Sequence, residues 1–384
     1  MIEAGIDEVT IILLPSDELI NTPNFRWDDA ANRMIYTAEE QLRLIELFGE
    51  KSCMKSAISG YSVEYTYGNC DFLFAVCYHH TFVKMGVLIR FSAQAFAYYQ
   101  EQTNLLPYEI LQTLHSPLFQ VRCSRIDIAI DYINEGIDIG DIYEDYMSGD
   151  LKVFVMREHN GRVEQISNNY RTQGIFTEGK CETLVFGKRE SAVMLRIYNK
   201  KVEQISKRGT RYSEALQYND WVRFEVEAKQ FYAHNLTYAL LNTKNEIEYK
   251  EIVLGFIIQK FYFAAKHNDN YIPTPYTKKL IEMKNDNSIT LFKSLTAKNT
   301  DLSKSLLHLL KTSGTTSTLY KIKAIWGNDG LENCIKIISN YINAKSYIPN
   351  ADCISFLKNH GKDYECLYKD FNTFFDNEIK PELE

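Results

Sequence analysis

The sequence lacks the patterns of several common protein classes. Its 384 residues contain no apolar run near the length of about 18 residues that a membrane-spanning helix needs. The acidic start MIEAGIDEVTIILLPSDE has no basic region and no small-residue cleavage site, so no signal peptide is expected. We therefore expect a cytoplasmic protein without a membrane partner.

Several catalytic and metal-binding motifs are also absent. The eight cysteines form no CxxC pair, which leaves a zinc ribbon unsupported, and in a cytoplasmic chain they are expected to be reduced. No GxxxxGK[ST], HExxH or GxSxG motif occurs, which disfavours P-loop ATPases, zinc proteases and α/β-hydrolases. The net charge of −7 excludes a protein that coats nucleic acid over its whole surface, so any such contact must be local.

One basic segment stands out against this acidic background. Residues 188–213 hold eight Lys or Arg and only two Glu. Such charge runs are often only solvated faces. Inside this one, however, the stretch SAVMLRIYNKKVE at 191–203 alternates apolar residues with Arg196, Tyr198 and Lys200. Period-two alternation predicts a strand that places the tyrosine between two cations on one face.

The order of the elements predicts an α+β fold. Strand-like runs dominate the first two thirds of the chain, which favours an antiparallel-sheet domain followed by a helical C-terminal region. We place the boundary between residues 1–285 and 286–384. The linker candidates are 268–279, which contains two prolines, and 283–290.

Smaller features complete this outline. The residues at 157–180 predict a polar connection between strands, and the pattern from 230 onward turns helical. Gly68 and Asn69 together form a hairpin signal. Asp301 is a candidate cap for a helix over LSKSLLHLLK.

Three predicted strands share one design, with a charged face opposite an apolar face. The charged faces carry Arg125, Asp127 and Asp131 in CSRIDIAIDY, Arg196, Tyr198 and Lys200 in AVMLRIYNK, and Arg223, Glu225 and Glu227 in WVRFEVEAK. The wet face of an ordinary antiparallel sheet would explain these charges without any function. The functional alternative is that the three strands are neighbours and pool their charged faces into one site.

Such a pooled face suits phosphodiester chemistry. Two or three carboxylates can hold a hard cation such as Mg²⁺ or Mn²⁺, and the cation can offset charge on a leaving oxygen. A tyrosine hydroxyl can attack phosphorus covalently, but its usual pKa near 10 means that it needs activation. Neighbouring cations such as Arg196 and Lys200 favour the phenolate.

The ordered set of these motifs resembles the Rep_trans, or replication initiation factor, family. The resemblance covers about residues 5–265 and rests on GIDEVTIIL, GVLIRFSAQAFAYY, SRIDIAIDY, LVFGKRESAVMLRIYNKKVE and WVRFEVEAK. It implies a relaxase-like fold with the first domain acting as a DNA nickase. The expected activity is rolling-circle replication initiation by a metal-dependent single-strand endonuclease and ligase that forms a 5′-phosphotyrosyl link. The paired-histidine metal motif of better-known relaxases is absent, so carboxylates must take its place.

The resemblance also implies roles for single residues. Tyr198 would be the nucleophile, with Arg196 and Lys200 on the scissile phosphate. The expected role assignments for the other residues are: metal ligands Asp127 and Glu225 first, then Asp131 and Glu227; DNA contacts Arg125, Arg189, Lys201 and Arg223; and Glu203 to orient Lys200 or bind the metal.

The implied partner is DNA, as an origin hairpin that is single-stranded at the nick, with a host helicase acting alongside. Residues 300–384 hold ten Lys or Arg and eleven Asp or Glu, which fits a homodimer contact or helicase recruitment better than a second DNA-coating surface. Relaxases of integrative conjugative elements and phage initiators share the same chemistry, so the biological use stays open. A non-catalytic origin-binding protein is the alternative of another class. A tyrosine recombinase is disfavoured, because that class needs a helical catalytic domain with an Arg/His constellation, whereas Tyr198 is predicted on a strand.

Overall fold

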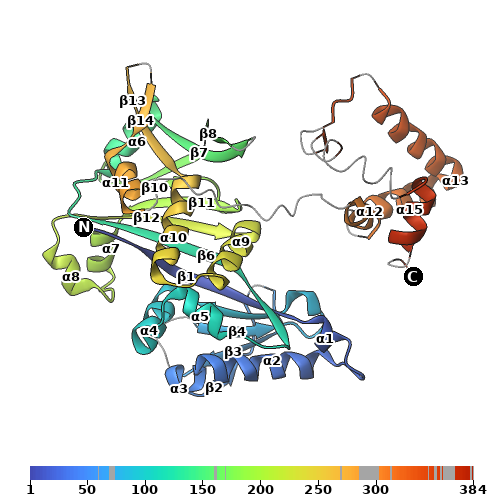
Figure 1. The fold of residues 1–384 in the computed structure, drawn as a ribbon, viewed down its shortest axis with the longest axis horizontal. Coiled ribbons are helices and arrows are strands. Elements are labelled where there is room, and N and C mark those ends of the chain that lie inside the picture. Colours follow the sequence, from blue (N-terminus) through green and yellow to red (C-terminus); the bar gives the residue numbers. More distant parts are fainter. Residues whose placement is uncertain are drawn as a thin grey trace. The chain divides into compact units, whose positions relative to one another are not determined.

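The computed structural model shows two compact units, Met1–Phe292 and Lys293–Glu384 (Figure 1). It describes residues 1–284 apart from 59, 69–73, 160–161, 169 and 269, and beyond them 302–311, 314–344, 346–349, 353–354, 357, 368–380 and 383. Asn69 of the predicted hairpin, the Asp301 cap and most of the 283–290 linker lie outside these residues. Within them, no helix is long and apolar enough to cross a membrane.

A large antiparallel sheet forms the centre of the first unit. Among the described residues it has ten strands, and every neighbouring pair is antiparallel. In spatial order the strands are β2 (Lys51–Cys53), β3 (Val63–Tyr67), β4 (Phe74–Tyr78), β5 (Val87–Phe91), β1 (Ile2–Pro15), β6 (Phe119–Ile133), β12 (Trp221–Lys229), β11 (Val193–Asn199), β10 (Lys180–Phe186) and β9 (Thr172–Thr177). The predicted antiparallel α+β fold is confirmed.

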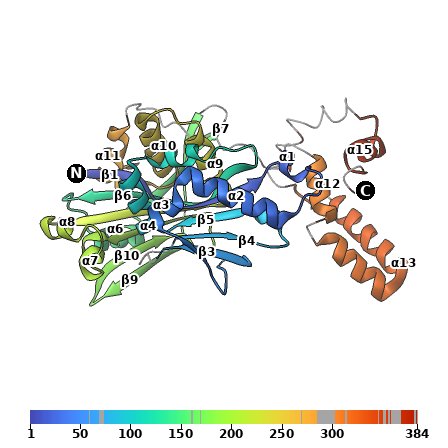
Figure 2. The same ribbon diagram turned by 90° about the horizontal axis from the view of Figure 1, so that it is seen from below.

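The two faces of this sheet differ in chemistry. Alternation in β6, β11 and β12 sends their Ile, Leu, Val and Phe side chains to one face, where they form the main hydrophobic core. Helices α2 (Trp27–Leu42), α9 (Gln230–Leu241) and α10 (Glu246–Lys260) cover that face, and Figure 2 shows them on one side of the sheet. The charged side chains of the same strands point to the opposite face.

A second, smaller sheet packs on the same apolar face. Its described strands are β14 (Asn270–Pro273), β13 (Tyr262–His267), β7 (Leu151–His159) and β8 (Arg162–Ser167), in that order. Phe263 of β13 joins the two sheets, since its ring meets the rings of Phe186 and Phe224 edge-on at centroid distances of 5.4 and 5.9 Å.

The remaining elements of the first unit are short. They are α1 (Asp17–Ile20), α3 (Leu44–Phe48), the 3₁₀ turn η1 (Val83–Met85), α4 (Ala93–Thr103), α5 (Pro107–Thr113), α6 (Ile139–Ser148), α7 (Lys200–Ser206), α8 (Tyr212–Gln217) and α11 (Pro275–Met283).

Two predictions about connections are wrong. The expected linker at 268–279 contains β14 and the first part of α11. Pro275 starts this helix at a position that needs no backbone N–H, and Thr274 caps it. The expected polar connection at 157–180 contains β8 and β9, each the last described strand of its sheet, and β9 is mostly exposed, so it needs no apolar alternation. Helical structure after residue 230 is also interrupted, by β13.

The second unit is helical where it is described. Its elements are α12 (Leu302–Lys311), α13 (Thr315–Ile342) and α15 (Phe371–Glu378). The backbone of α13 is non-helical at Gly327, where φ is +71°, a conformation that favours glycine. The predicted helical C-terminal region is therefore confirmed, whereas the function assigned to it is untested.

Candidate nicking site on the polar sheet face

The three strands with charged faces lie side by side. The register of β12 against β6 sets Arg223 opposite Asp131 and Glu227 opposite Asp127. The register of β11 against β12 sets Tyr198 opposite Arg223 and Arg196 opposite Glu225. Residues that face each other across an antiparallel pair point to the same side of the sheet. The predicted residues that lie on β6, β11 and β12 therefore share one surface, which we call the polar face.

Tyr198 donates a hydrogen bond to a carboxylate on the neighbouring strand. The distance from its phenolic oxygen to Glu225 Oε2 is 2.8 Å, and Arg196 Nη2 binds the other oxygen of the same carboxylate. Glu225 is buried, and Arg196 Nε is buried without a hydrogen-bond acceptor. Burial, together with Glu225, raises the pKa of the Tyr198 phenol well above its usual range. The resting phenol is thus neutral, and its proton lies on a path to Glu225.

A cavity of about 530 Å³ opens over Tyr198. Polar groups from several elements line it: Glu8 from β1, Arg196 and Tyr198 from β11, Glu225 from β12, and Lys200, Glu203 and Lys207 from α7. Its apolar lining includes Ile175 and Val202, which are half-exposed. A phosphodiester with an attached base has room here beside both cations and apolar side chains.

Lys200 lines this cavity, but the alternation was wrong to place it on the strand. β11 ends at Asn199, whose side chain accepts a hydrogen bond from Val202 N at 3.0 Å and caps α7, so Lys200 starts the helix. The Lys200 Nζ lies 2.6 Å from Glu203 Oε2 and 5.6 Å from the centre of the Tyr198 ring. The expected partnership of Glu203 with Lys200 is therefore present in the structure.

Asp127 belongs to a second charged group on the polar face. Arg125 binds both oxygens of Asp127 at 2.8 and 2.5 Å, and also lies 3.0 Å from Glu227 and 3.4 Å from Glu8. Burial raises the pKa of Asp127 to about 7 despite Arg125, and Glu225 and Glu8 add to the rise. Asp127, Glu225 and Glu8 are therefore close enough to repel one another.

Glu8 is a candidate that strand alternation did not predict. Burial raises its pKa, and its buried Oε1 has no hydrogen-bond partner. A bulge at Asp7 in β1 sends Ile6 into the core while both Asp7 and Glu8 reach charged partners on the polar face. The sequence feature that could have indicated Glu8 is the pair of acidic residues, Asp7 and Glu8, inside the otherwise mainly apolar stretch GIDEVTIIL.

The remaining candidates differ in how they could meet DNA. Arg223 is buried, binds both oxygens of Asp131 at 2.7 and 2.6 Å, and binds Asp7 at 2.9 Å, so it joins strands and does not face a ligand. Lys201 Nζ donates to the carbonyls of Tyr218 and Asn219 at 2.6 and 3.2 Å. Arg189 is exposed in the turn between β10 and β11, where a phosphate can reach it.

The carboxylates on the polar face have the donor chemistry of a Mg²⁺ or Mn²⁺ site. Oxygen ligands suit these ions, and Asp127, Glu225 and Glu8 carry buried, mutually repelling charge that a cation would relieve. As they stand, however, no three His, Cys, Asp or Glu side chains among the described residues are arranged to hold an ion. Arg125 and Arg196 occupy the carboxylate oxygens, so binding requires these guanidinium groups to move.

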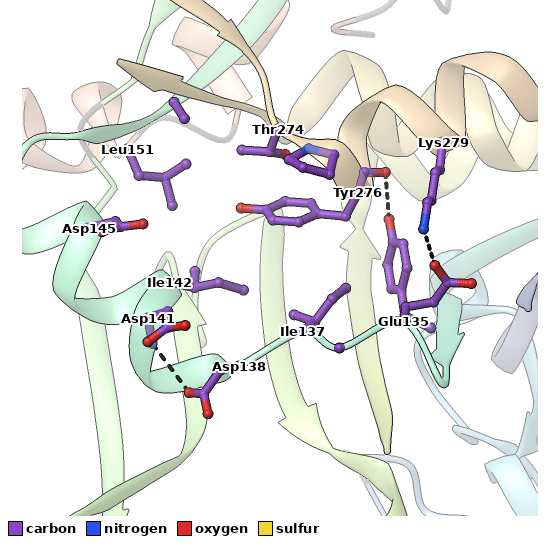
Figure 3. Close-up of a pocket in the computed structure, with 14 residues that line it drawn as sticks. Glu135, Ile137, Asp138, Asp141, Ile142, Asp145, Leu151, Thr274, Tyr276 and Lys279 are labelled. Atoms are coloured by element: carbon purple, nitrogen blue, oxygen red, sulfur yellow. Dashed lines mark hydrogen bonds and ion pairs between the residues drawn. The ribbon is translucent and has the colours of Figure 1, made fainter. Parts of the chain in front are cut away.

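A second cavity, of about 310 Å³, lies at the start of α6 and holds none of the predicted residues (Figure 3). Its carboxylates have structural partners. Asp138 accepts a hydrogen bond from Gly140 N at 2.6 Å and caps α6, and Glu135 binds Lys279. Asp141 and Asp145 add further negative charge to its wall, which would repel a phosphate.

The comparisons with known proteins agree with this geometry. The sequence model described as replication initiation factor matches residues 121–335, more than half of the chain. The chain belongs to the replication initiation factor family. The match covers β6, β11 and β12, the strands that carry the predicted residues of this family's site.

A solved structure shares the fold. The rolling circle replication initiator protein from Geobacillus stearothermophilus superposes with a TM-score of 0.53 at 16% sequence identity, over 74% of this chain and 97% of that chain. At this identity the likeness concerns the fold alone. No curated protein matches the chain.

Proposed function

We propose that this protein initiates rolling-circle replication by nicking one DNA strand with Tyr198. The carrying observation is the 2.8 Å hydrogen bond from Tyr198 to Glu225 within a cavity that also presents Arg196 and Lys200. Family membership and the shared fold support the biological context. Joining two DNA ends is the reverse of the same step, so the protein acts as both endonuclease and ligase.

The chemical step needs a base, and Glu225 is placed to serve as one. As the Tyr198 oxygen bonds to phosphorus, its proton passes to Glu225 Oε2. The bond from phosphorus to the 3′ oxygen breaks, and that oxygen takes a proton from water to become the 3′ hydroxyl. The 5′ phosphate stays linked to Tyr198. Glu225 was predicted first as a metal ligand, but its hydrogen bond to the nucleophile favours this different role.

Arg196 is placed to bind the scissile phosphate. Its Nη2 is held by Glu225, while its Nε has no acceptor within the described residues. A phosphate oxygen would satisfy this donor and place phosphorus beside the phenol. Lys200 adds positive charge 5.6 Å from the centre of the tyrosine ring.

A divalent cation would be held by Asp127 and Glu8, with Asp131 and Glu227 further along the same face. When bound, Mg²⁺ or Mn²⁺ would offset the negative charge that develops on the phosphate oxygens. Asp131 is the weaker ligand candidate, because Arg223 occupies both of its oxygens.

The test uses supercoiled plasmid DNA that carries the protein's own gene and its flanks, incubated with the full-length chain and Mn²⁺. A denaturing gel should show an open-circle product and a covalent protein–DNA adduct, and Tyr198→Phe should show neither. If wild-type protein shifts the DNA on a native gel but yields no adduct, the protein only binds its origin and the proposal fails.

A host helicase and a homodimer are proposed partners. The helicase follows from the family resemblance, and the homodimer from the nearly balanced charge of residues 300–384.

A further inference from the structure

A bulge in β6 brings an additional arginine onto the polar face. Cys123 pairs with Ile11 and Arg125 pairs with Thr10, so Ser124 is an extra residue in β6. In a regular strand, residues three apart point to opposite faces. Because of the bulge, Arg122 and Arg125 share the polar face, while Cys123 is buried in the core.

A second arginine stands across β1 from Arg122. Arg90 on β5 pairs with Thr10, and Arg122 on β6 pairs with Ile12, so both side chains point to the polar face. β5 and β6 flank β1 directly, and their backbones are therefore about 10 Å apart. This spacing allows two long side chains to reach one bound group between them.

Within the described part of the chain, neither of these two arginines forms a close ion pair with a carboxylate, unlike the neighbouring arginines on the polar face. Among the described residues, Arg122 has no carboxylate within 4.0 Å, and its buried Nε has no acceptor. The nearest carboxylate oxygen to Arg90 belongs to Glu8, at 3.9 Å. By contrast, Arg125 and Arg223 each bind a carboxylate through two hydrogen bonds.

We propose that Arg90 and Arg122 form a second phosphate site, for the single DNA strand that leaves the nicking cavity. The identity of its ligand rests on the proposed function: a DNA strand held at Tyr198 continues from there across the sheet. Counting register positions along β6 and across β12 places Arg122 roughly 25–30 Å from Tyr198, a distance of several nucleotides.

Arg196 offers an internal comparison for this assignment. Within the described residues only two arginines have a buried Nε without an acceptor, Arg196 and Arg122, and both lie on the polar face. A buried donor left unpaired costs free energy that a bound acceptor recovers. The same chemistry that makes Arg196 a phosphate ligand therefore applies to Arg122 at the other end of the strand path.

The experiment measures binding only, so it does not depend on cleavage. Full-length Tyr198→Phe protein is titrated with oligo(dT) strands of increasing length across a series of salt concentrations. In this background Arg122→Gln should weaken binding of the longer strands about tenfold and leave the shortest strands unaffected. The slope of log affinity against log salt should fall by about 0.7, the loss of one phosphate contact.

Two control variants keep the result decisive. Arg122→Lys retains the charge and should retain the slope, and Lys278→Gln removes an exposed charge on α11 and should change neither quantity. If Arg122→Gln lowers affinity equally at every length, or leaves the slope unchanged, the second phosphate site is refuted. A weaker effect on single strands than on duplex DNA would refute it as well. If the wild-type chain does not nick DNA but Arg122→Gln still gives the expected binding changes, only the proposed function is refuted.

Discussion

The phenolic oxygen of Tyr198 and the carboxylate of Glu225 lie 2.8 Å apart on neighbouring strands, and Arg196 fixes the second carboxylate oxygen. Burial and Glu225 keep the Tyr198 phenol protonated in this arrangement, because they raise its pKa. In the proposed nicking step, Arg196 Nε binds the phosphate beside the phenol while Nη2 holds Glu225 in place. One guanidinium would thereby link phosphate binding to the position of the proposed base.

Replacing Glu225 by Gln should slow strand cleavage by roughly 10²–10⁴, because the phenol loses its proton acceptor. The rate is measured in single turnover on an oligonucleotide that spans the mapped nick. The loss should shrink as pH rises, since solvent hydroxide then replaces the missing base. Glu214→Gln, which removes a carboxylate bound to Arg211 away from the cavity, is the matched control. Equal rates for both variants would rule out Glu225 as the base.

Metal binding should depend on the protonation of Asp127. Its pKa of about 7 means that the carboxyl is about half protonated at neutral pH, and a cation must displace that proton. Affinity for Mn²⁺ should therefore rise as pH increases through 7, with proton release visible as a buffer-dependent heat in calorimetry. Asp127→Asn should weaken Mn²⁺ binding and remove the proton release. A pH-independent affinity in the wild-type chain would contradict this ligand assignment.

The raised pKa of Asp127 also affects stability. The folded state binds this proton more tightly than the unfolded chain, where the carboxyl has its ordinary value of 3.8, so the favourable contribution exists at low pH. It is lost as pH rises toward 7, at about 1.4 kcal/mol per pKa unit. The free energy of unfolding, from urea titrations at several pH values, should fall across this window relative to Asp127→Asn. A parallel pH dependence in the variant would show that other groups are responsible.

Arg223 should matter for stability more than for DNA binding. It is buried with Asp131 and Asp7, so Arg223→Met leaves carboxylate charge without its partner and should cost about 3–5 kcal/mol of unfolding free energy. The double variant Arg223→Met with Asp131→Leu should recover part of this loss, because the buried charge is then removed with its partner. If Arg223→Met unfolds like the wild type but binds DNA more weakly, the arginine is a DNA contact after all.

The site was predictable where short-range patterns determine it. Alternation in RIYNK and VRFEVEAK correctly placed Tyr198, Arg196 and Glu225 on one face, because strand periodicity is a local property. The pattern failed at Lys200, where the Asn199 cap ends the strand. It also missed Glu8 and Arg122, because each lies beside a bulge that only strand pairing creates. The ion pairs that join Arg223 to Asp131 and Asp7 depend on register between distant segments, which sequence periodicity does not specify.

The extra residue in β6 separates two regions of one strand. Deleting Ser124 would leave both faces of β6 as they are, because Arg125 already pairs with Thr10, Cys123 with Ile11 and Arg122 with Ile12: Cys123 would still face the core and Arg122 the polar face. What the residue adds is the local bend and twist of a bulge, so its deletion would straighten β6 between Asp127 and Arg122 without exchanging the two faces.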